Sequence, residues 1–202
     1  MNHEILDLFQ RRYACHAFEA DRQIAPADLE VILEAGRLSP SSFGLEHWKF
    51  VVVTKPEEKA ALQAACFRQR QVGSASAVIV ILAKITDMHP DSDYIKTLMA
   101  REYPGEALEQ AMANYRGVYA HTEVKSWSIM QCYIAAANMM TATTAVGLDS
   151  CAIGGFLPDD VKKIIDKEGD RYEIALILPI GYCAEEPHEK LRLPLSELVE
   201  YR

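Results

Sequence analysis

The sequence predicts an α+β domain in which helices cover a sheet, and three observations support this. Residues 77–83 form an uninterrupted apolar run and residues 172–180 a nearly uninterrupted one, as is typical of strands buried on both faces. Segments whose apolar residues recur every three or four positions surround these runs and indicate amphipathic helices. Helices outnumber strands, so we expect a three-layer arrangement of α+β or α/β type.

Length and charge limit the class of protein. The chain has 202 residues, and neither a repeat nor a flexible linker divides it, so we expect one domain over residues 1–202. Its 21 Lys and Arg residues against 29 Asp and Glu residues give a net charge of −8. Because nucleic-acid and anionic-membrane binders need clustered positive charge, we expect neither as a partner.

The expected elements follow one another irregularly along the chain. The β-branched and aromatic residues of 48–54 predict a further strand, and residues 148–153 a shorter one. The expected helices cover residues 3–12, 26–38, 56–66, 94–101, 106–119, 126–147 and 158–166. Residues 86–122, which include two of these helices, are polar and aromatic, as is typical of a lid or a substrate-binding region.

Residues 126–148 carry no formal charge, although they are long enough to span a bilayer, which takes about 20 residues. The segment contains several Ser, Thr, Asn and Gln residues, and no second such segment accompanies it. A helix that is apolar or small on every side is instead buried by other protein. We therefore expect a helix at the domain centre or in a subunit interface, and no membrane span.

Cysteine and histidine spacing gives no sign of a disulfide framework or a metal site. The five cysteines are odd in number and far apart, at Cys15, Cys66, Cys132, Cys151 and Cys183. No pair forms Cys-x-x-Cys, and the six histidines lack metal-ligand spacing. The start of the chain is acidic and lacks the features of a signal peptide. These observations favour a reduced, cytoplasmic protein without a metal.

Three segments carry residues that could hold a phosphate, although the usual glycine-rich phosphate loops are absent. They are Arg11-Arg12-Tyr13, the serine loop Ser39–Gly44, and Lys190 with Arg192. Taken singly, they are a cationic helix end, a polar turn and a pair of surface cations. Taken together, they supply the cations and hydroxyls that a dianion requires.

Five segments, in order, resemble the FMN-dependent, oxygen-insensitive NAD(P)H nitroreductases. They are RRYACHAF (11–18), LSPSSFGLEHWKFVVVT (38–54), SASAVIVIL (74–82), GLDSCAIGGF (147–156) and KLRLP (190–194). QCYIA (131–135) with GLDSCAIGGF looks like the subgroup that activates nitroimidazole prodrugs such as metronidazole. The resemblance implies a three-layer α/β/α fold with a central, mostly antiparallel sheet.

The resemblance also implies a homodimer in which the long central helices pack on each other and two FMN molecules lie in interface clefts. The tail, residues 183–202, would reach over the partner subunit, so Lys190 and Arg192 could act through the dimer. Arg12, Lys190 and Arg192 would then hold the FMN phosphate. The whole cofactor-binding set implied is Arg11, Arg12, Tyr13, Ala14, His16, Ser39, Pro40, Ser41, Ser42, Phe43, Gly44, Arg68, Gln71, Ile153, Gly154, Gly155, Lys190 and Arg192.

Within this set, Ser41, Ser42 and the backbone of 43–44 would face the isoalloxazine and ribityl groups. Gly154 and Gly155 would present backbone N–H groups to flavin N5 and O4, where fixed dipoles set the potential. Glycine there lets the backbone approach closely.

Four positions depart from the family pattern. Ala14 stands where the family often has Ser, which removes a ribityl hydrogen bond. His16 replaces the usual Lys and would stabilise reduced flavin less than a fixed cation. Arg68 replaces a frequent Asn, and it or Arg70 could restore that cation. Gly154 replaces a frequent Glu, as it does in the nitroimidazole-activating subgroup.

The implied reaction is a ping-pong, two-electron transfer from NAD(P)H through the flavin to a nitroaromatic, a quinone or another flavin. The cofactor performs the chemistry, so we expect no catalytic protein nucleophile. Phe43, Tyr115 and Tyr119 are candidate walls of the acceptor pocket. The alternatives are a flavin, enone or aldehyde reductase on the same scaffold, a non-catalytic flavin-binding dimer, and a helical scaffold without a cofactor. The physiological acceptor and the choice between NADH and NADPH stay open.

Overall fold

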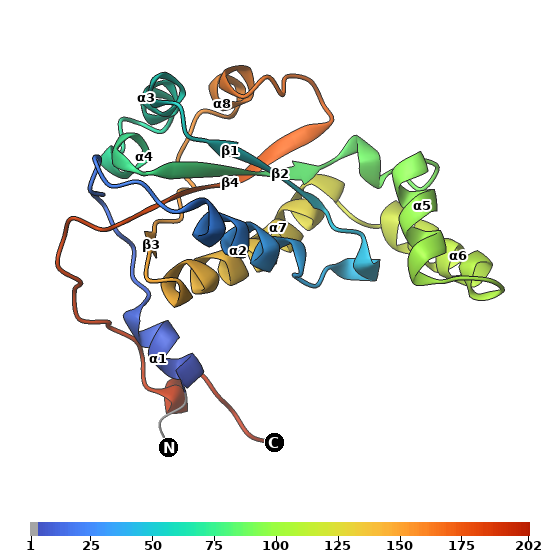
Figure 1. Ribbon diagram of the computed structural model, residues 1–202. Coiled ribbons are helices and arrows are strands. Elements are labelled where there is room, and N and C mark those ends of the chain that lie inside the picture. The colour runs from blue at the N-terminus through green and yellow to red at the C-terminus, as the bar shows by residue number, and fades with distance from the viewer. Residues whose placement is uncertain (1–3) are drawn as a thin grey trace.

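Four antiparallel strands form one sheet in the order β1-β2-β4-β3 in the computed structural model, which describes residues 4–202 (Figure 1). The strands are β1 (Trp48–Val53), β2 (Ala77–Lys84), β3 (Asp149–Ser150) and β4 (Tyr172–Gly181). The expected antiparallel sheet is confirmed. The expected strand at 148–153 is mostly wrong, because the chain leaves the sheet after Ser150 and returns only for a single bridge between Ile153 and Ile177.

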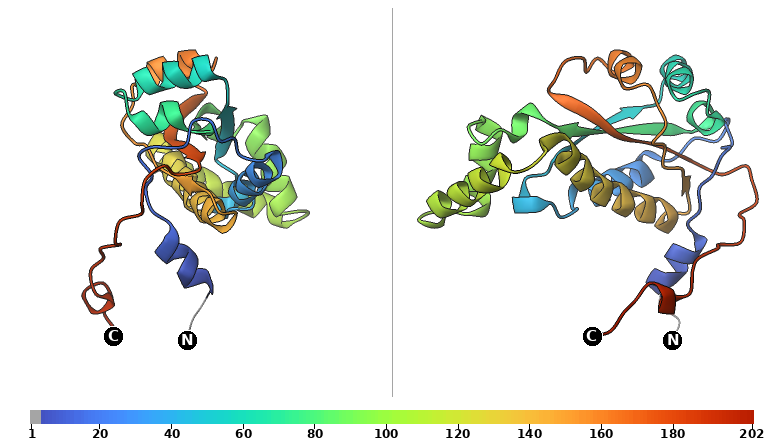
Figure 2. Two further views of the ribbon diagram at one scale, coloured as in Figure 1. Left: turned by 60° about the vertical axis from the view of Figure 1, so that its left-hand side comes forward. Right: turned by 180° about the vertical axis from the view of Figure 1, so that it is seen from behind.

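Helices cover both faces of the sheet, as the sequence predicts. On one face lie α3 (Pro56–Ala65), α4 (Arg70–Ser74) and α8 (Pro158–Ile164), and on the other lie α2 (Pro26–Arg37) and α7 (Val124–Ala145) (Figures 1 and 2). Alternate side chains of β2 point to opposite faces. Val78, Val80 and Leu82 therefore pack in one core, and Ile79 and Ile81 in the other.

The charge-free segment forms α7, which begins at a Glu123 side chain that accepts hydrogen bonds from two backbone amides. Ala135, Ala136 and Met139 are buried beneath the sheet, whereas Met130 and Tyr133 are 58% and 47% exposed. One side of the helix is thus core and the other is open. Among the described residues, none of the helices has the length and apolarity needed to cross a membrane.

The region 86–122 is helical and has a small core of its own. It contains η2 (Thr86–Met88), α5 (Asp93–Glu102) and α6 (Ala107–Ala120), which project beyond one end of the sheet (Figure 1). The short helix η1 (Ser42–Gly44) joins them there. The buried residues of η2, α5 and α6 form one cluster with Leu45, which follows η1, and Trp127 of α7; they are Met88, Ile95, Leu98, Met99, Ala111 and Tyr115.

Both ends of the chain extend away from the sheet together. Helix α1 (Glu4–Arg11) lies beside the tail, which includes the short helix η3 (Leu195–Glu197) (Figures 1 and 2). The expected helix at 3–12 is confirmed within its described part, while residue 3 lies outside the described residues. The ammonium group of Lys190 donates hydrogen bonds to the carbonyl oxygens of Phe9 and Arg12, which holds the two ends together.

The expectation that no disulfide would form is wrong, because Cys15 is bonded to Cys183. The two cysteines are separated by 168 residues, so their spacing in the sequence gives no sign of a pair. They meet because Phe18 and Cys183 form an antiparallel bridge, with Ala184 donating a backbone hydrogen bond to Ala17. Cys66, Cys132 and Cys151 are buried and unbonded.

Candidate functional site

Arg12, Lys190 and Arg192 meet at one cavity of about 440 Å³. Leu6, Phe9 and Gln10 of α1 complete its lining. All three cations belong to the same chain, so their convergence does not require a partner subunit. The structure thereby brings together residues that are almost 180 positions apart in the sequence.

The charge of this cavity is not neutralised from within the chain. In the part of the chain that the structure describes, none of the three cations forms an ion pair with a carboxylate. The pKa of Lys190 is lowered, first by desolvation and then by the neighbouring charges of Arg12 and Arg192. A dianion bound here would relieve this repulsion. The cavity therefore fits a phosphate group.

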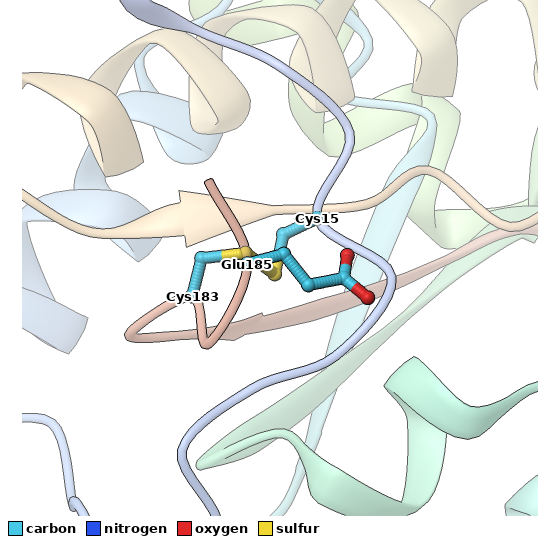
Figure 3. A group of neighbouring side chains, drawn as sticks. All are labelled: Cys15, Cys183 and Glu185. Atoms are coloured by element: carbon cyan, nitrogen blue, oxygen red, sulfur yellow. A yellow bond between two sulfur atoms is a disulfide. The ribbon is translucent and has the colours of Figure 1, made fainter. Parts of the chain in front are cut away.

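The segment that follows Arg12 is fixed between the sheet and the tail. Ala14 forms a parallel bridge with Ser150, and the Tyr13 hydroxyl donates to the Glu185 carbonyl over 3.1 Å. The backbone N–H of His16 donates to the Glu185 carboxylate over 3.2 Å, beside the disulfide (Figure 3). Burial, followed by nearby carboxylates, raises the pKa of Tyr13 to about 12, so its phenol is neutral and remains a donor.

Gly154 and Gly155 leave two backbone amides free at an exposed loop. Within the described chain, neither N–H donates a hydrogen bond, and both residues are exposed. A Cβ placed at Gly154 would meet only the Tyr133 hydroxyl, at 4.0 Å. The open space around Gly154 fits the close approach of a planar ligand.

Two residues that sequence reasoning missed lie beside these glycines. The Gln69 side chain donates to the Gly155 carbonyl over 2.9 Å, and the ring of Phe67 would lie 3.6 Å from a Cβ at Gly155. Phe67 is 62% exposed, and both it and Arg68 have left-handed φ values, of 54° and 60°. Two consecutive left-handed residues that are not glycine leave no recognisable pattern in the sequence. Only the fold therefore shows that Phe67 and Gln69 lie beside the glycines. The Gln71 side chain is buried and donates a hydrogen bond to the Gln69 side chain.

The serine loop uses most of its hydroxyl groups internally. Ser39 donates to the Ala35 carbonyl and accepts from the Asn138 side chain, and Ser41 accepts from the Glu46 amide. The Ser42 amide donates to Gln131 over 3.0 Å, while its hydroxyl has no partner among the described residues. Ser42 is thus the serine of this loop whose hydroxyl is available to a ligand. Pro40 is exposed at the same turn.

The turn between Ser42 and the strand contains three left-handed residues, Phe43, Gly44 and Glu46. Phe43 has φ 56° and Gly44 has φ 67°. A Cβ at Gly44 would lie 2.8 Å from the Glu102 side chain, so α5 closes over this turn. Phe43 keeps part of its ring accessible, which suits a pocket wall.

The other two expected pocket aromatics behave differently from each other. Tyr115 has no exposed surface, donates to the Met88 carbonyl over 2.6 Å and packs edge-on against Phe43. It is therefore a core residue that supports Phe43, and it does not line an open pocket in this conformation. Tyr119 is partly exposed and packs against His89.

Within a single chain, the serine loop and the amides of Gly154 and Gly155 lie apart, on different sides of α7. Gln131 and Asn138, which hold the serine loop, are seven residues apart and share one side of α7. Tyr133, which faces Gly154, lies about 200° around the helix from Gln131, at 100° per residue. The two expected halves of the flavin site therefore lie on opposite sides of the long helix.

These features define a class of protein. They are an α+β fold, an unpaired cation cluster suited to a phosphate, and free backbone amides at an open loop. The sequence model of the Nitroreductase family matches residues 9–182, and the chain belongs to this family. The resemblance of the sequence motifs to the nitroreductase family is confirmed, while the nitroimidazole-activating subgroup stays a prediction.

Relatives match the chain over its whole length. "Putative NAD(P)H nitroreductase YfkO" of Bacillus subtilis is 34% identical, covering 98% of this chain and 97% of the relative. "Putative NAD(P)H nitroreductase SERP2086" of Staphylococcus epidermidis is 35% identical, covering 100% of this chain and 98% of the relative.

Solved structures share the fold. A Nitroreductase Family Protein from Streptococcus pneumoniae has a TM-score of 0.80 at 28% identity, with coverage of 98% of this chain and 99% of that one. A "putative nitroreductase in complex with FMN" from Exiguobacterium sibiricum has a TM-score of 0.85 at 24% identity, with coverage of 100% and 99%. The expected nitroreductase-like α+β fold is confirmed.

Proposed function

We propose that this chain reduces nitroaromatics, quinones or related acceptors by two electrons in a ping-pong cycle. As a nitroreductase it is an FMN-dependent oxidoreductase that uses NAD(P)H. Bound FMN supplies the hydride chemistry, and the protein supplies position and electrostatics. The observation that carries the assignment is the convergence of Arg12, Lys190 and Arg192 on one cavity without any carboxylate partner in the described chain.

The protein groups divide the work of holding FMN. Arg12, Lys190 and Arg192 would bind the phosphate, while Tyr13 and the disulfide join the segment after Arg12 to the start of the tail. The amides of Gly154 and Gly155 would face N5 and O4 of the ring. They are rigid donors, because Ile153 is bridged to Ile177 immediately before them. Donors held in this way need no reorganisation when negative charge develops on the ring.

We further propose that the site is completed in a homodimer. The serine loop and the glycine amides lie on opposite sides of α7, so a second copy is needed to bring a serine loop to each pair of glycines. The exposed side of α7, with Met130, Tyr133 and Ile134, supplies an apolar surface for this contact. Exposed apolar patches of this kind mark interaction sites.

The tail supports the same assembly. Leu191, Leu193 and Leu195 are 79%, 61% and 71% exposed in the single chain. Strand β1 is an edge of the sheet, and a cavity of about 420 Å³ beside it includes Trp48 and Phe50. An edge strand with an apolar groove can accept an extended segment. The partner's tail, residues 183–202, reaches this groove with the part beyond Arg192, because Cys183 and Lys190 are held by their own chain.

Three measurements test these assignments in order. The purified protein should be yellow, and mass spectrometry should identify the released flavin as FMN. The holoprotein should oxidise NADH or NADPH when a nitroaromatic or a quinone is added. A colourless protein that stays colourless with added FMN would refute the cofactor, and a yellow protein without turnover would identify a non-catalytic flavin-binding dimer.

The dimer has its own test. The mass in solution, measured by light scattering, should be twice that of one chain. Ile134→Glu places a charge on the open side of α7 and should yield monomers that release FMN. Val118→Glu, on the exposed surface of α6, is the matched control and should stay dimeric. A monomeric wild type that retains FMN would overturn the proposed assembly.

An enone reductase is the second candidate function. CLA-ER, described as an enone reductase of gut-bacterial fatty-acid saturation, shares the fold with a TM-score of 0.81 at 23% identity, over 99% of this chain and 98% of that one. Enone, aldehyde and free-flavin acceptors should therefore be tested beside nitro compounds. A kcat/KM for an enone above that for every nitroaromatic would favour this candidate.

We also propose a cytoplasmic location for the protein. The three unbonded, buried cysteines are compatible with a reducing compartment. Cell fractionation tests this, and recovery of the protein outside the cytoplasm would refute it. In such a compartment, a disulfide is usually transient and has a redox role.

A further inference from the structure

A disulfide joins the two segments that would hold the FMN phosphate. Cys15 lies three residues after Arg12, and Cys183 stands at the start of the tail that carries Lys190 and Arg192. The carboxylate of Glu185 lies beside both sulfurs (Figure 3). Neither cysteine has a part in the flavin chemistry proposed above, so the bond requires a separate explanation.

The two sulfurs differ in their access to solvent. Cys15 has no exposed surface, whereas Cys183 is partly exposed and lines a cavity of about 610 Å³ together with Arg11 and Glu185. An incoming thiol can therefore reach Cys183 and not Cys15. Among the other cysteines, burial raises the pKa of Cys66 to about 11, so that thiol is neutral and a weak nucleophile.

Few other contacts fix the tail. Past Ala184, the tail forms hydrogen bonds with the rest of the described chain through Glu185, which accepts from Tyr13 and His16, and through Lys190. Residues 191–202 form hydrogen bonds only with one another within the described structure. The disulfide is therefore the covalent constraint that keeps the root of the tail beside the Arg12 segment.

We propose that Cys15–Cys183 is a thiol–disulfide exchange site for a small or protein dithiol, and that its oxidised state retains FMN by holding Lys190 and Arg192 against Arg12. This inference rests on the phosphate-binding role proposed for those cations. When the disulfide already holds Lys190 and Arg192 in place, FMN binding does not have to order the tail. The entropic cost of binding is therefore lower and the affinity is higher.

The exchange is balanced in atoms and electrons. A thiolate of the dithiol attacks the Sγ of Cys183, forming a mixed disulfide and breaking the bond to Cys15, whose thiolate then takes a proton. The second thiol of the dithiol attacks the mixed disulfide and releases Cys183 as a thiol. Two electrons and two protons pass to the protein, and the dithiol becomes a disulfide. Oxidation by a small disulfide reverses these steps.

The first experiment counts thiols in the holoprotein. Alkylation in denaturant, followed by intact mass, should add three groups per chain before treatment with dithiothreitol and five after it. Peptide mapping should identify Cys15 and Cys183 as the additional sites. Five alkylated cysteines in protein that has been oxidised with a small disulfide would overturn the proposal.

The second experiment measures FMN retention through the fluorescence that FMN regains when it dissociates. Reduction of the wild type should raise the dissociation constant about tenfold, the scale of one charged hydrogen bond, and reoxidation should restore it. Cys183→Ser should behave like the reduced protein in both states. Cys66→Ala, the matched removal of an unbonded cysteine, should keep the wild-type redox response. A dissociation constant that is the same within twofold in both redox states would overturn the proposal.

A third measurement separates positioning of the cations from a general loosening of the fold. In Arg192→Ala, reduction should change FMN binding much less than in the wild type, because one of the groups that the bond positions is gone. Equal redox effects in both backgrounds would contradict the positioning role. If the oxidised wild type binds no FMN, the proposed function fails. If it binds FMN without regard to redox state, this inference alone fails.

Discussion

The ammonium group of Lys190 donates a hydrogen bond to the main-chain carbonyl oxygen of Arg12, 178 residues earlier in the chain. This contact places two cations at the mouth of one cavity, and Arg192 adds a third. Neighbouring cations repel one another unless an anion lies between them. A cluster of three cations without a carboxylate partner among the described residues therefore fits a site for an anion. The geometry of the tail is thus part of the phosphate site that we propose.

Arg192→Ala should weaken FMN binding by about 1.5–3 kcal/mol, the scale of one charged hydrogen bond. The dissociation constant, from titration of FMN fluorescence, would rise by about 10- to 100-fold. Arg202→Ala, in the same tail, is the control, because within residues 4–202 Arg202 pairs only with Glu200 and lines no part of the cavity. Unchanged flavin occupancy of Arg192→Ala after extensive dialysis would remove Arg192 from the phosphate site.

His16→Lys should raise the midpoint potential of the flavin. A fixed cation near the pyrimidine edge favours the extra negative charge of the reduced ring, by about 10–40 mV for roughly 0.5–2 kcal/mol in a two-electron couple. A spectroelectrochemical titration measures the shift. His188→Lys adds the same charge within the exposed tail and should shift the potential less. An unchanged or lower potential in His16→Lys would contradict a position near the flavin.

Gly155→Ala should lower FMN affinity while leaving the fold intact. The added methyl would lie 3.6 Å from Phe67 and 3.7 Å from the Gln69 side chain, which are ordinary contacts, so the melting temperature should change little. The same methyl would hinder the close approach of a planar ligand to this part of the backbone. Gly117→Ala on α6 meets nothing within 4 Å and serves as the control, with unchanged FMN binding. Equal FMN affinity in Gly155→Ala and the wild type would indicate that the ring lies elsewhere.

Lys84 should give the protein a distinct pH dependence of stability. Its ammonium group donates to the Glu46 carbonyl over 2.7 Å and to the Tyr94 hydroxyl over 2.6 Å. Burial lowers the pKa of Lys84 to about 8 from an ordinary value of 10.5. Between these two values the unfolded chain binds more protons than the folded one, so the contribution of Lys84 to the unfolding free energy rises with pH.

Urea unfolding of the wild type and of Lys84→Met at pH 7.5, 8.5 and 9.5 measures this contribution. The difference in unfolding free energy, wild type minus variant, should grow with pH by up to about 1 kcal/mol per pH unit. Lys49→Met, at an exposed position of β1, is the matched control. It should leave the dependence of the unfolding free energy on pH as it is in the wild type. A pH-independent difference for Lys84→Met would show that Lys84 keeps its proton in this range.

Much of the fold was predictable because the relevant signals are local. Apolar runs predicted β2 and β4. The helical spacing of apolar residues, together with a proline in the first turn, predicted α2, α3 and α8. The absence of charge in 126–148 predicted α7 and its burial by other protein, whereas in the single chain only one side of the helix is buried. The strand at 148–153 was overestimated because β propensity does not reveal where the chain leaves the sheet, and here it leaves after Ser150.

The sequence predicted some residues of the candidate site from their motifs, but it did not predict their neighbours or their exposure. Arg12, Lys190 and the glycines carry recognisable motifs, whereas Phe67 and Gln69 were missed, because a left-handed turn without glycine has no sequence pattern. Tyr115 was expected at a pocket wall, but it is buried, since aromatic residues serve cores and pockets alike.

The sequence by itself determined the class of this protein: an α+β domain of acidic net charge whose ordered motifs match the nitroreductases. Only the tertiary structure decided which distant residues meet. It brought Cys15 to Cys183 and Arg12 to Lys190, and it placed the serine loop and the glycine amides on opposite sides of α7. The physical reason is that propensity and periodicity act over a few residues. Contacts between segments 170 or so positions apart depend instead on how the whole chain packs around its sheet.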